Sequence, residues 1–207
     1  MNMRLLLPVN SALARPLVPL FIQIGFSANA ITLLSILFGF LGVVGLLQGT
    51  VPGIMAGALG FLVANILDEC DGKVARQTGT SSRLGALLDT WADFLVHTAF
   101  FLALGIGMSR QFSVRSWLVL GIIAAIGNVV SFILDLRGFS GVQTKDQLAN
   151  QAPDCFAWMT EWFRVDFSIL VLVSALLHQT GWILWAGAVG VFLVWIPSTV
   201  LIVARRR

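Results

Sequence analysis

Long apolar stretches separated by short polar segments dominate the hydrophobic pattern of the chain. Each stretch has about the 20 residues that a helix needs to cross the hydrocarbon core of a bilayer. Unpaired backbone groups are too costly at membrane depth, so helices are predicted rather than open strands. The pattern therefore predicts an all-α integral membrane protein with six transmembrane helices, at about residues 30–48, 51–70, 84–108, 114–135, 164–180 and 182–204.

The first 25 residues are also apolar, but Pro8, Pro16 and Pro19 interrupt them. Proline removes a backbone donor and breaks a continuous helix. We therefore expect residues 1–25 to form an amphipathic helix lying in the membrane interface rather than a span. Residues 26–207 would form the six-helix core, so that the whole chain, residues 1–207, is one membrane domain.

The composition supports a membrane protein, and the basic residues predict its orientation. Hydrophobic residues make up 57% of the chain, charged residues make up 11%, and the mean hydropathy is +0.90. Basic loops stay on the cytoplasmic side, and all 13 Lys and Arg except Arg110 and Arg115 lie there if both termini are cytoplasmic. This placement explains the net charge of +3 without nucleic-acid binding. Cys70 and Cys155 fall on the same side, where thiols stay reduced, so no disulfide is predicted.

Four aspartates are the strongest candidates for chemistry. Asp68 and Asp71 are three residues apart, and Asp89 and Asp93 are four apart, so each pair projects from one face of its helix. The short turn at residues 77–82 makes the two helices antiparallel neighbours, which lets the four carboxylates converge. Such a cluster requires positive charge, and oxygen ligands suit Mg²⁺ or Mn²⁺, with two ions expected for phosphoryl chemistry.

Small and basic residues accompany the aspartates. Gly72 allows backbone to approach a ligand, Ala75 keeps the next turn narrow, and Gly85 clears space one turn from Asp89. Arg76 offers a rigid donor fork that matches pyrophosphate oxygens. The stretch therefore combines an acidic cluster for metals, a gap for a nucleotide and a cation for phosphate.

The pattern Asp-x₂-Asp-Gly-x₂-Ala-Arg-x₈-Gly-x₃-Asp-x₃-Asp, from Asp68 to Asp93, resembles the signature of the CDP-alcohol phosphotransferase family. Every fixed position and both gaps match. The family also has a Pro-Asn-x-x-Thr element before its first span, to which residues 28–32 are similar, with Ala28 in place of proline. The resemblance implies that Asn29 and Thr32 lie near the nucleotide.

The resemblance also implies roles for the matched residues. Asp68, Asp71 and Asp89 would bind metal, and Asp93 would be both a metal neighbour and the general base that deprotonates the acceptor hydroxyl. The CDP site would be lined by Gly72, Ala75, Arg76 and Gly85. The family fold has six spans with cytoplasmic ends and is often a homodimer.

The implied reaction is transfer of a phosphatidyl group from CDP-diacylglycerol to a small polar alcohol, with release of CMP, in phospholipid biosynthesis. An alternative within the family is transfer of a phosphoalcohol, for example from CDP-inositol, to a lipid or inositol-phosphate acceptor. The similarity to bacterial and archaeal members predicts an inner or plasma membrane, with the active site cytoplasmic.

Two other classes of membrane protein use acidic residues. Transporters place ionisable residues near the bilayer midplane on several helices, whereas the acids here gather at one side. A prenyl-transferring enzyme would use aspartates and Mg²⁺, but the Gly-x-x-Ala-Arg element fits it poorly. His97 extends the stripe of Asp89 and Asp93 by one turn and is either a buried structural histidine or part of a pocket. The loop at 137–164 and residues 164–167 are candidates for acceptor contacts.

Overall fold

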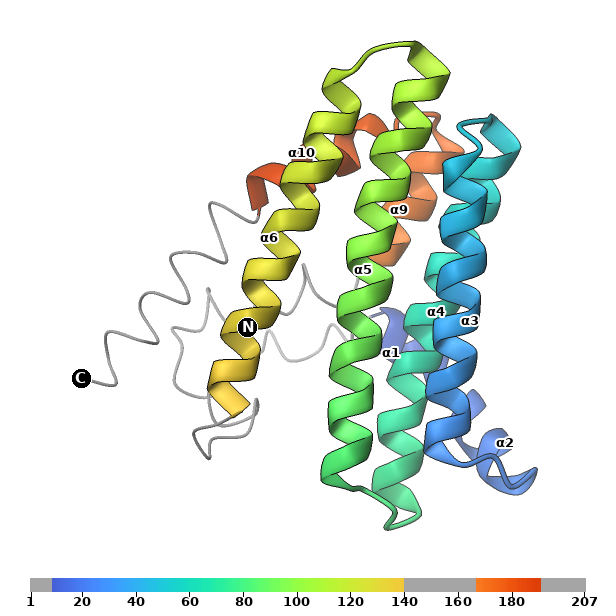
Figure 1. Cartoon of the computed structure of the whole chain (residues 1–207). Helices are drawn as coiled ribbons and strands as arrows, with labels where there is room; N and C mark the ends of the chain where they lie inside the picture. The colour runs from blue at the N-terminus through green and yellow to red at the C-terminus, as the bar shows by residue number, and fades with distance from the viewer. Residues whose placement is uncertain (1–8, 140–166, 191–207) are drawn as a thin grey trace, which may run out of the picture.

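The computed structural model describes residues 9–139 and 167–190, and every described element is a helix (Figure 1). Two short helices come first, α1 (Val9–Ala14) and α2 (Leu17–Gln23). Four long helices follow: α3 (Ala28–Leu47), α4 (Val51–Gln77), α5 (Arg83–Phe112) and α6 (Ser116–Phe139). The last two described helices are α9 (Phe167–Leu176) and α10 (Gly181–Gly190). The all-α prediction is confirmed.

Polar caps fix where the long helices begin. The side chains of Ser27, Thr50 and Ser82 precede α3, α4 and α5, and each accepts a hydrogen bond from a backbone N–H in the first turn of its helix. Such caps satisfy donors that have no partner within the helix. Helix α4 ends at Gln77 and α5 begins at Arg83, both outside the predicted apolar limits, so the signature residues lie on regular helix.

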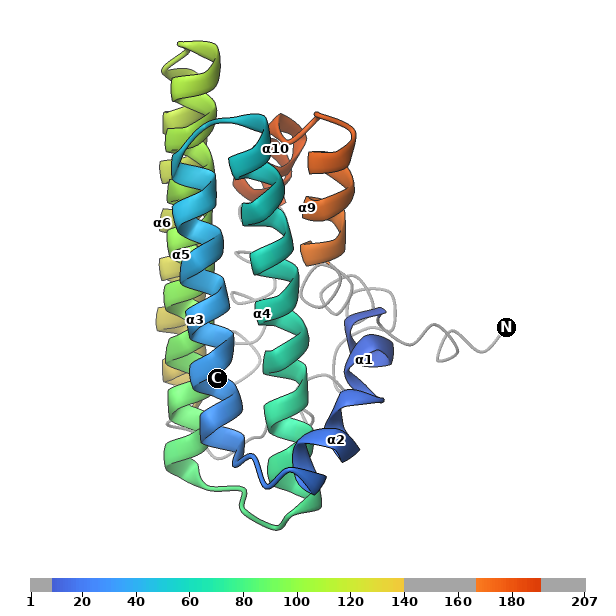
Figure 2. The ribbon, with the colours of Figure 1, turned by 90° about the vertical axis from the view of Figure 1, so that its right-hand side faces the viewer.

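The arrangement of the helices agrees with the predicted antiparallel pair and adds a third helix to it. Helices α4 and α5 run antiparallel, as predicted, but they make few direct contacts with each other. Helix α3 instead packs extensively against both of them, α6 packs on α5, and α9 packs on α4 (Figures 1 and 2). Helices α4 and α5 are therefore neighbours held apart by α3, which leaves space between their polar ends.

Glycines set the close approach of the packed helices. A Cβ atom on Gly60 of α4 would lie 2.9 Å from Cα of Gly42 on α3, and one on Gly121 of α6 would lie 2.8 Å from Cα of Gly105 on α5. Small residues allow helix backbones to approach closely in membranes, where packing rather than hydrophobic transfer drives association. These contacts hold α3 against α4 and α5 against α6.

The N-terminal segment is two short helices rather than the single helix predicted for residues 1–25. The break lies at Arg15 and Pro16, and Pro16 occupies the N-cap position of α2. Both helices pack on α4, where Ala14 and Val18 join a buried cluster with Cys70 and Val74. Residues 1–8 lie outside the described part of the chain.

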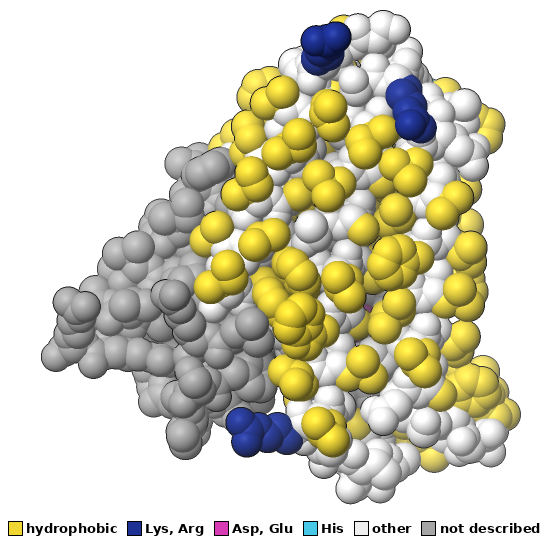
Figure 3. Space-filling model, in the orientation of Figure 1, with side chains coloured by type: hydrophobic (Ala, Val, Ile, Leu, Met, Phe, Trp, Pro, Cys, Tyr) yellow, Lys and Arg dark blue, Asp and Glu magenta, His cyan; other side chains and the backbone are white. Residues whose placement is uncertain are grey.

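The surface has the pattern of a membrane protein. Figure 3 shows hydrophobic side chains over the middle of one face, with Lys and Arg side chains at its two ends. Within the described residues, α3, α4 and α5 are long and apolar enough to cross a membrane, by length and composition. The three other predicted spans correspond to α6, α9 and α10, whose described apolar parts are shorter, so the count of six stays a prediction.

Candidate metal and nucleotide site

Three of the four signature aspartates lie together at one end of the bundle. Asp68 and Asp71 come from α4 and Asp89 comes from α5, and each offers a carboxylate oxygen within 4.8 Å of the other two. Asp71 is buried, with 4% of its surface exposed. Carboxylates this close repel one another unless a cation or proton neutralises them. The oxygen-only donor set therefore fits a hard divalent cation.

Helix α3 supports this carboxylate triad from a third side. The hydroxyl of Thr32 donates a 2.5 Å hydrogen bond to Oδ2 of Asp71, and Thr32 is itself buried. Hydrogen bonds of this length are typical of a hydroxyl that binds an ionised carboxylate. Thr32, expected near the nucleotide, is thus a hydrogen-bond partner of a candidate metal ligand, a contact that the sequence analysis did not predict.

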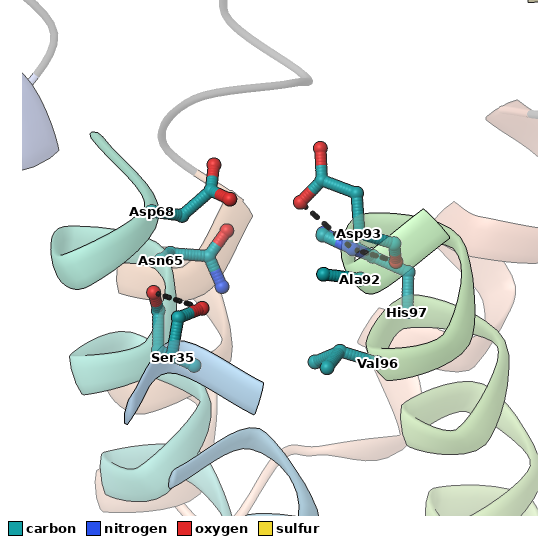
Figure 4. A pocket seen from close by; sticks show the side chains of 8 residues that line it. Ser35, Asn65, Asp68, Ala92, Asp93, Val96 and His97 are labelled. Carbon is teal, nitrogen blue, oxygen red and sulfur yellow. Dashed lines mark hydrogen bonds and ion pairs between the residues drawn. The ribbon is translucent and has the colours of Figure 1, made fainter. Parts of the chain in front are cut away.

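Asp93 lies outside the triad. It faces Asp68 across a pocket between α4 and α5 (Figure 4), and its side chain is 45% exposed. His97, one turn further along α5, places Nδ1 2.8 Å from the backbone oxygen of Asp93 and 4.0 Å from Oδ1 of the same residue. An accessible carboxylate beside the triad could accept a proton from a bound hydroxyl.

The pocket continues beyond Asp68 and Asp93 toward the middle of the bundle. Its lining includes Ser35 from α3, Asn65 from α4 and His97 from α5. The sequence analysis singled out His97 but missed Ser35 and Asn65. A signal was available, because Ser35 follows Thr32 by three residues and Asn65 precedes Asp68 by three, so each extends a signature face by one turn.

The residues predicted to line the CDP site lie near the triad at the same end of α4 and α5. The Arg76 guanidinium folds back over Gly72, where an added Cβ would lie 3.3 Å from Nη1. A Cβ on Gly85 would lie 3.6 Å from Oδ1 of Asn29, so Asn29 at the start of α3 faces the start of α5. Asn29 and Arg76 are exposed and free to meet a ligand, and Ala75 is partly buried on α4.

Other polar residues at this end have structural partners. Lys73 forms an ion pair with Glu69 at 3.0 Å and donates to Oγ of Ser11 at 2.6 Å, which ties α1 to α4. Cys70 is fully buried and directs its sulfur toward the backbone oxygen of Ala14 at 3.7 Å. These contacts separate Lys73 and Cys70 from the ligand-facing side of α4.

The acceptor candidates fall mostly outside the described residues. This is true of Arg164, Asp166 and most of the loop at 137–164, which also contains Cys155. Phe167 is described, and it packs in an aromatic group with Phe61, Phe100 and Phe101. Its position indicates a packing role at the start of α9.

Comparison with known proteins identifies the family. The family model for CDP-alcohol phosphatidyltransferase matches residues 26–195, most of the chain. The chain belongs to this family. This CDP-alcohol phosphatidyltransferase is therefore a membrane phosphotransferase, and the family's metal dependence agrees with the carboxylate triad of Asp68, Asp71 and Asp89. None of the curated proteins matches its sequence significantly.

The fold of the CDP-alcohol phosphatidyltransferase is also found among solved structures, four chains of which match significantly. One is the phosphatidylinositol phosphate synthase of Mycobacterium tuberculosis, crystallised with CDP-DAG bound. The TM-score is 0.59 at 19% sequence identity, and the match covers 93% of this chain and 90% of the synthase. The likeness establishes the same helical architecture over nearly the whole of both chains.

Proposed function

We propose that this enzyme transfers a phosphatidyl group from CDP-diacylglycerol to a small polar alcohol, with release of CMP, as a step of phospholipid biosynthesis. The observation that supports the proposal best is the carboxylate triad on α4 and α5, with the accessible carboxylate of Asp93 across the pocket from it. A cation site beside a candidate base is the combination that transfer of a phosphoryl group to an alcohol needs.

The residues have separate tasks in this proposal. Asp68, Asp71 and Asp89 hold Mg²⁺ or Mn²⁺, with Thr32 orienting Asp71. Two bound ions, with Asp93 as a further ligand or neighbour, would neutralise the charge that develops on the pyrophosphate oxygens. The nucleotide and the pyrophosphate are contacted by Asn29, Thr32, Gly72, Ala75, Arg76 and Gly85.

The acceptor hydroxyl binds in the pocket between Asp68 and Asp93. Its oxygen forms a new bond to the β-phosphorus of the donor while the bond from that phosphorus to the CMP oxygen breaks. Asp93 takes the hydroxyl proton, and CMP leaves with the electron pair of the broken bond. An ordinary aspartate is a weak base at neutral pH, so this role requires the hydroxyl to be held close to a cation.

The choice of donor rests on the architecture and on the surface. The M. tuberculosis synthase that shares the fold binds CDP-DAG, and the apolar flanks of α3 leave Leu33, Leu37 and Leu41 more than half exposed, suited to acyl chains of membrane lipids. We further propose six spans, a site on the cytoplasmic side of a bacterial or archaeal membrane, and a homodimer.

The test is CMP release by the full chain in detergent with Mg²⁺ or Mn²⁺. CDP-diacylglycerol and CDP-inositol are each offered with glycerol phosphate, serine, inositol and inositol phosphate. We expect CMP with CDP-diacylglycerol, and loss of activity in Asp89→Asn. Asp93→Asn should reduce kcat by roughly 10²- to 10⁴-fold, the usual contribution of general-base catalysis.

Glu69→Gln is the matched control, because Glu69 lies between the signature residues of α4 but pairs with Lys73. It should keep nearly full activity. Absence of CMP from every pair of substrates, with wild type equal to Asp89→Asn, would refute the function. If CMP forms only with CDP-inositol, CDP-inositol is the donor in place of CDP-diacylglycerol. Full activity in Asp93→Asn would refute only the role of Asp93 as the general base.

A further inference from the structure

The pocket beyond the carboxylates has a polar floor, formed by Ser35, Asn65 and His97, inside an apolar bundle. It has a volume of about 200 Å³, including its open mouth, and its enclosed part holds about one water-sized group. The carboxyl groups of Asp68 and Asp93 face each other across it, and Asn65 and His97 line it from opposite helices (Figure 4). Polar groups at this depth in a membrane protein are costly unless they serve a function.

Three hydrogen-bond donors of the floor bond to backbone oxygens. Oγ of Ser35 donates to the oxygen of Ala64 at 3.0 Å, and Nδ2 of Asn65 donates to the oxygen of Phe61 at 2.8 Å. Nδ1 of His97 lies 2.8 Å from the backbone oxygen of Asp93. A carbonyl oxygen only accepts, so Nδ1 carries the proton of this hydrogen bond.

The groups that remain are acceptors, apart from the second N–H of the Asn65 amide. Among the described residues, Oδ1 of Asn65 has no hydrogen-bond partner, and neither has Nε2 of His97, which accepts a hydrogen bond when Nδ1 holds the only proton of the ring. The carboxylates of Asp68 and Asp93 add further acceptors at the mouth. A phosphate oxygen, an ester carbonyl or an acyl chain could satisfy none of these acceptors. The pocket is therefore complementary to a hydrogen-bond donor of the size of one hydroxyl or ammonium group.

We propose that Asn65 and His97 bind a second hydrogen-bond donor of the acceptor alcohol. This donor is carried by the carbon atom next to the one that bears the attacking hydroxyl. The inference rests on the proposed function, because it takes the attacking hydroxyl to lie between Asp68 and Asp93. The second donor then points away from the mouth and meets Asn65 and His97. It is either a neighbouring hydroxyl of a polyol or the ammonium group of an amino alcohol, and the floor selects such acceptors against plain alcohols.

The experiment compares two pairs of acceptors that differ only in this donor. In the first pair, sn-glycerol 3-phosphate is compared with 3-hydroxypropyl phosphate, which lacks the neighbouring hydroxyl. In the second, L-serine is compared with 3-hydroxypropionate, which lacks the amino group. We expect the complete member of one pair to have the higher kcat/KM by roughly 5- to 150-fold, the range expected when a buried acceptor loses its donor. The pair that shows the preference identifies the source of the donor.

Variants then locate the preference. In Asn65→Leu and His97→Leu the ratio within that pair should fall toward one, chiefly because the complete acceptor loses affinity. His97→Gln, which can place a polar atom near Nε2, should restore more of the ratio than His97→Asn, which replaces only Nδ1. The matched control is Asn128→Leu on α6, because Asn128 also donates at membrane depth, to Thr98 at 2.8 Å, but does not line the pocket. Its ratio should equal that of wild type.

Thermal unfolding in Mn²⁺ and CMP gives a readout that does not depend on turnover. Stabilisation by the complete acceptor but not by its analogue, lost in Asn65→Leu, supports the floor even if no CMP forms and the proposed function fails. Equal ratios and equal shifts for both members of both pairs in wild type would overturn the inference. So would a preference that persists in both leucine variants.

Discussion

The hydrogen bond between Thr32 and Asp71 allows a sharp test of how the metal site is held. Thr32→Val keeps the shape of the side chain and removes the hydroxyl. Both residues are buried, each about 4% exposed, so water cannot replace the lost donor. A hydrogen bond to a charged group contributes about 1.5–3 kcal/mol, which corresponds to roughly a 10- to 150-fold change in an equilibrium constant. Partners of metal ligands contribute about 10- to 100-fold to metal affinity.

We therefore expect Thr32→Val to raise the Mn²⁺ concentration for half-maximal CMP release by about 10- to 100-fold. Saturating Mn²⁺ should restore most of the rate, since the three carboxylates remain. The shift of the unfolding temperature with Mn²⁺, measured without substrates, should move to higher Mn²⁺ in parallel. Thr32→Ser keeps the hydroxyl and should stay close to wild type.

Two results would refute this reasoning. An unchanged Mn²⁺ dependence in Thr32→Val would show that the 2.5 Å contact does not order Asp71. A raised KM for the CDP donor with normal Mn²⁺ dependence would instead show that Thr32 contacts the nucleotide, the role that the family resemblance implies.

Two further predictions concern the nucleotide end and the bundle. Arg76→Lys should raise the KM for the CDP donor about tenfold, because an ammonium cannot make the paired contacts of a guanidinium. Arg83→Lys is the control and should leave this KM unchanged. Equal effects in both variants would contradict a specific role for Arg76. Gly121→Ala should lower the free energy of unfolding by about 1–3 kcal/mol, the usual cost of overpacking, because its Cβ would lie 2.8 Å from Cα of Gly105. Gly190→Ala should be neutral, because no atom of the described residues lies within 4 Å of a Cβ on Gly190. Thermal unfolding in detergent measures this difference, and equal melting temperatures for the two alanine variants would show that the α5–α6 contact relaxes at no cost.

The sequence was sufficient for the helices and for the signature. Apolar runs of membrane length have few alternatives to helix, and spacings of three and four residues place Asp68 with Asp71 and Asp89 with Asp93 whatever the tertiary arrangement. These spacings alone could not divide the four carboxylates into a triad and a separate Asp93, a division that only the family resemblance implied. That division depends on the distance between α4 and α5, which no local pattern encodes.

The distance between α4 and α5 is determined by α3, and the turn at 77–82 did not predict this role of a third helix. A short turn implies direct packing of the helices it joins, but Gly42 and Gly60 bring α3 and α4 together so closely that α3 takes that place. The same contact brings Thr32 beneath Asp71 and Ser35 beside the pocket. The third helix thus supplies both the gap that substrates need and the hydrogen bonds that order its walls. A change at the glycine contacts should therefore alter metal affinity without touching a ligand, because it would move Thr32 relative to Asp71.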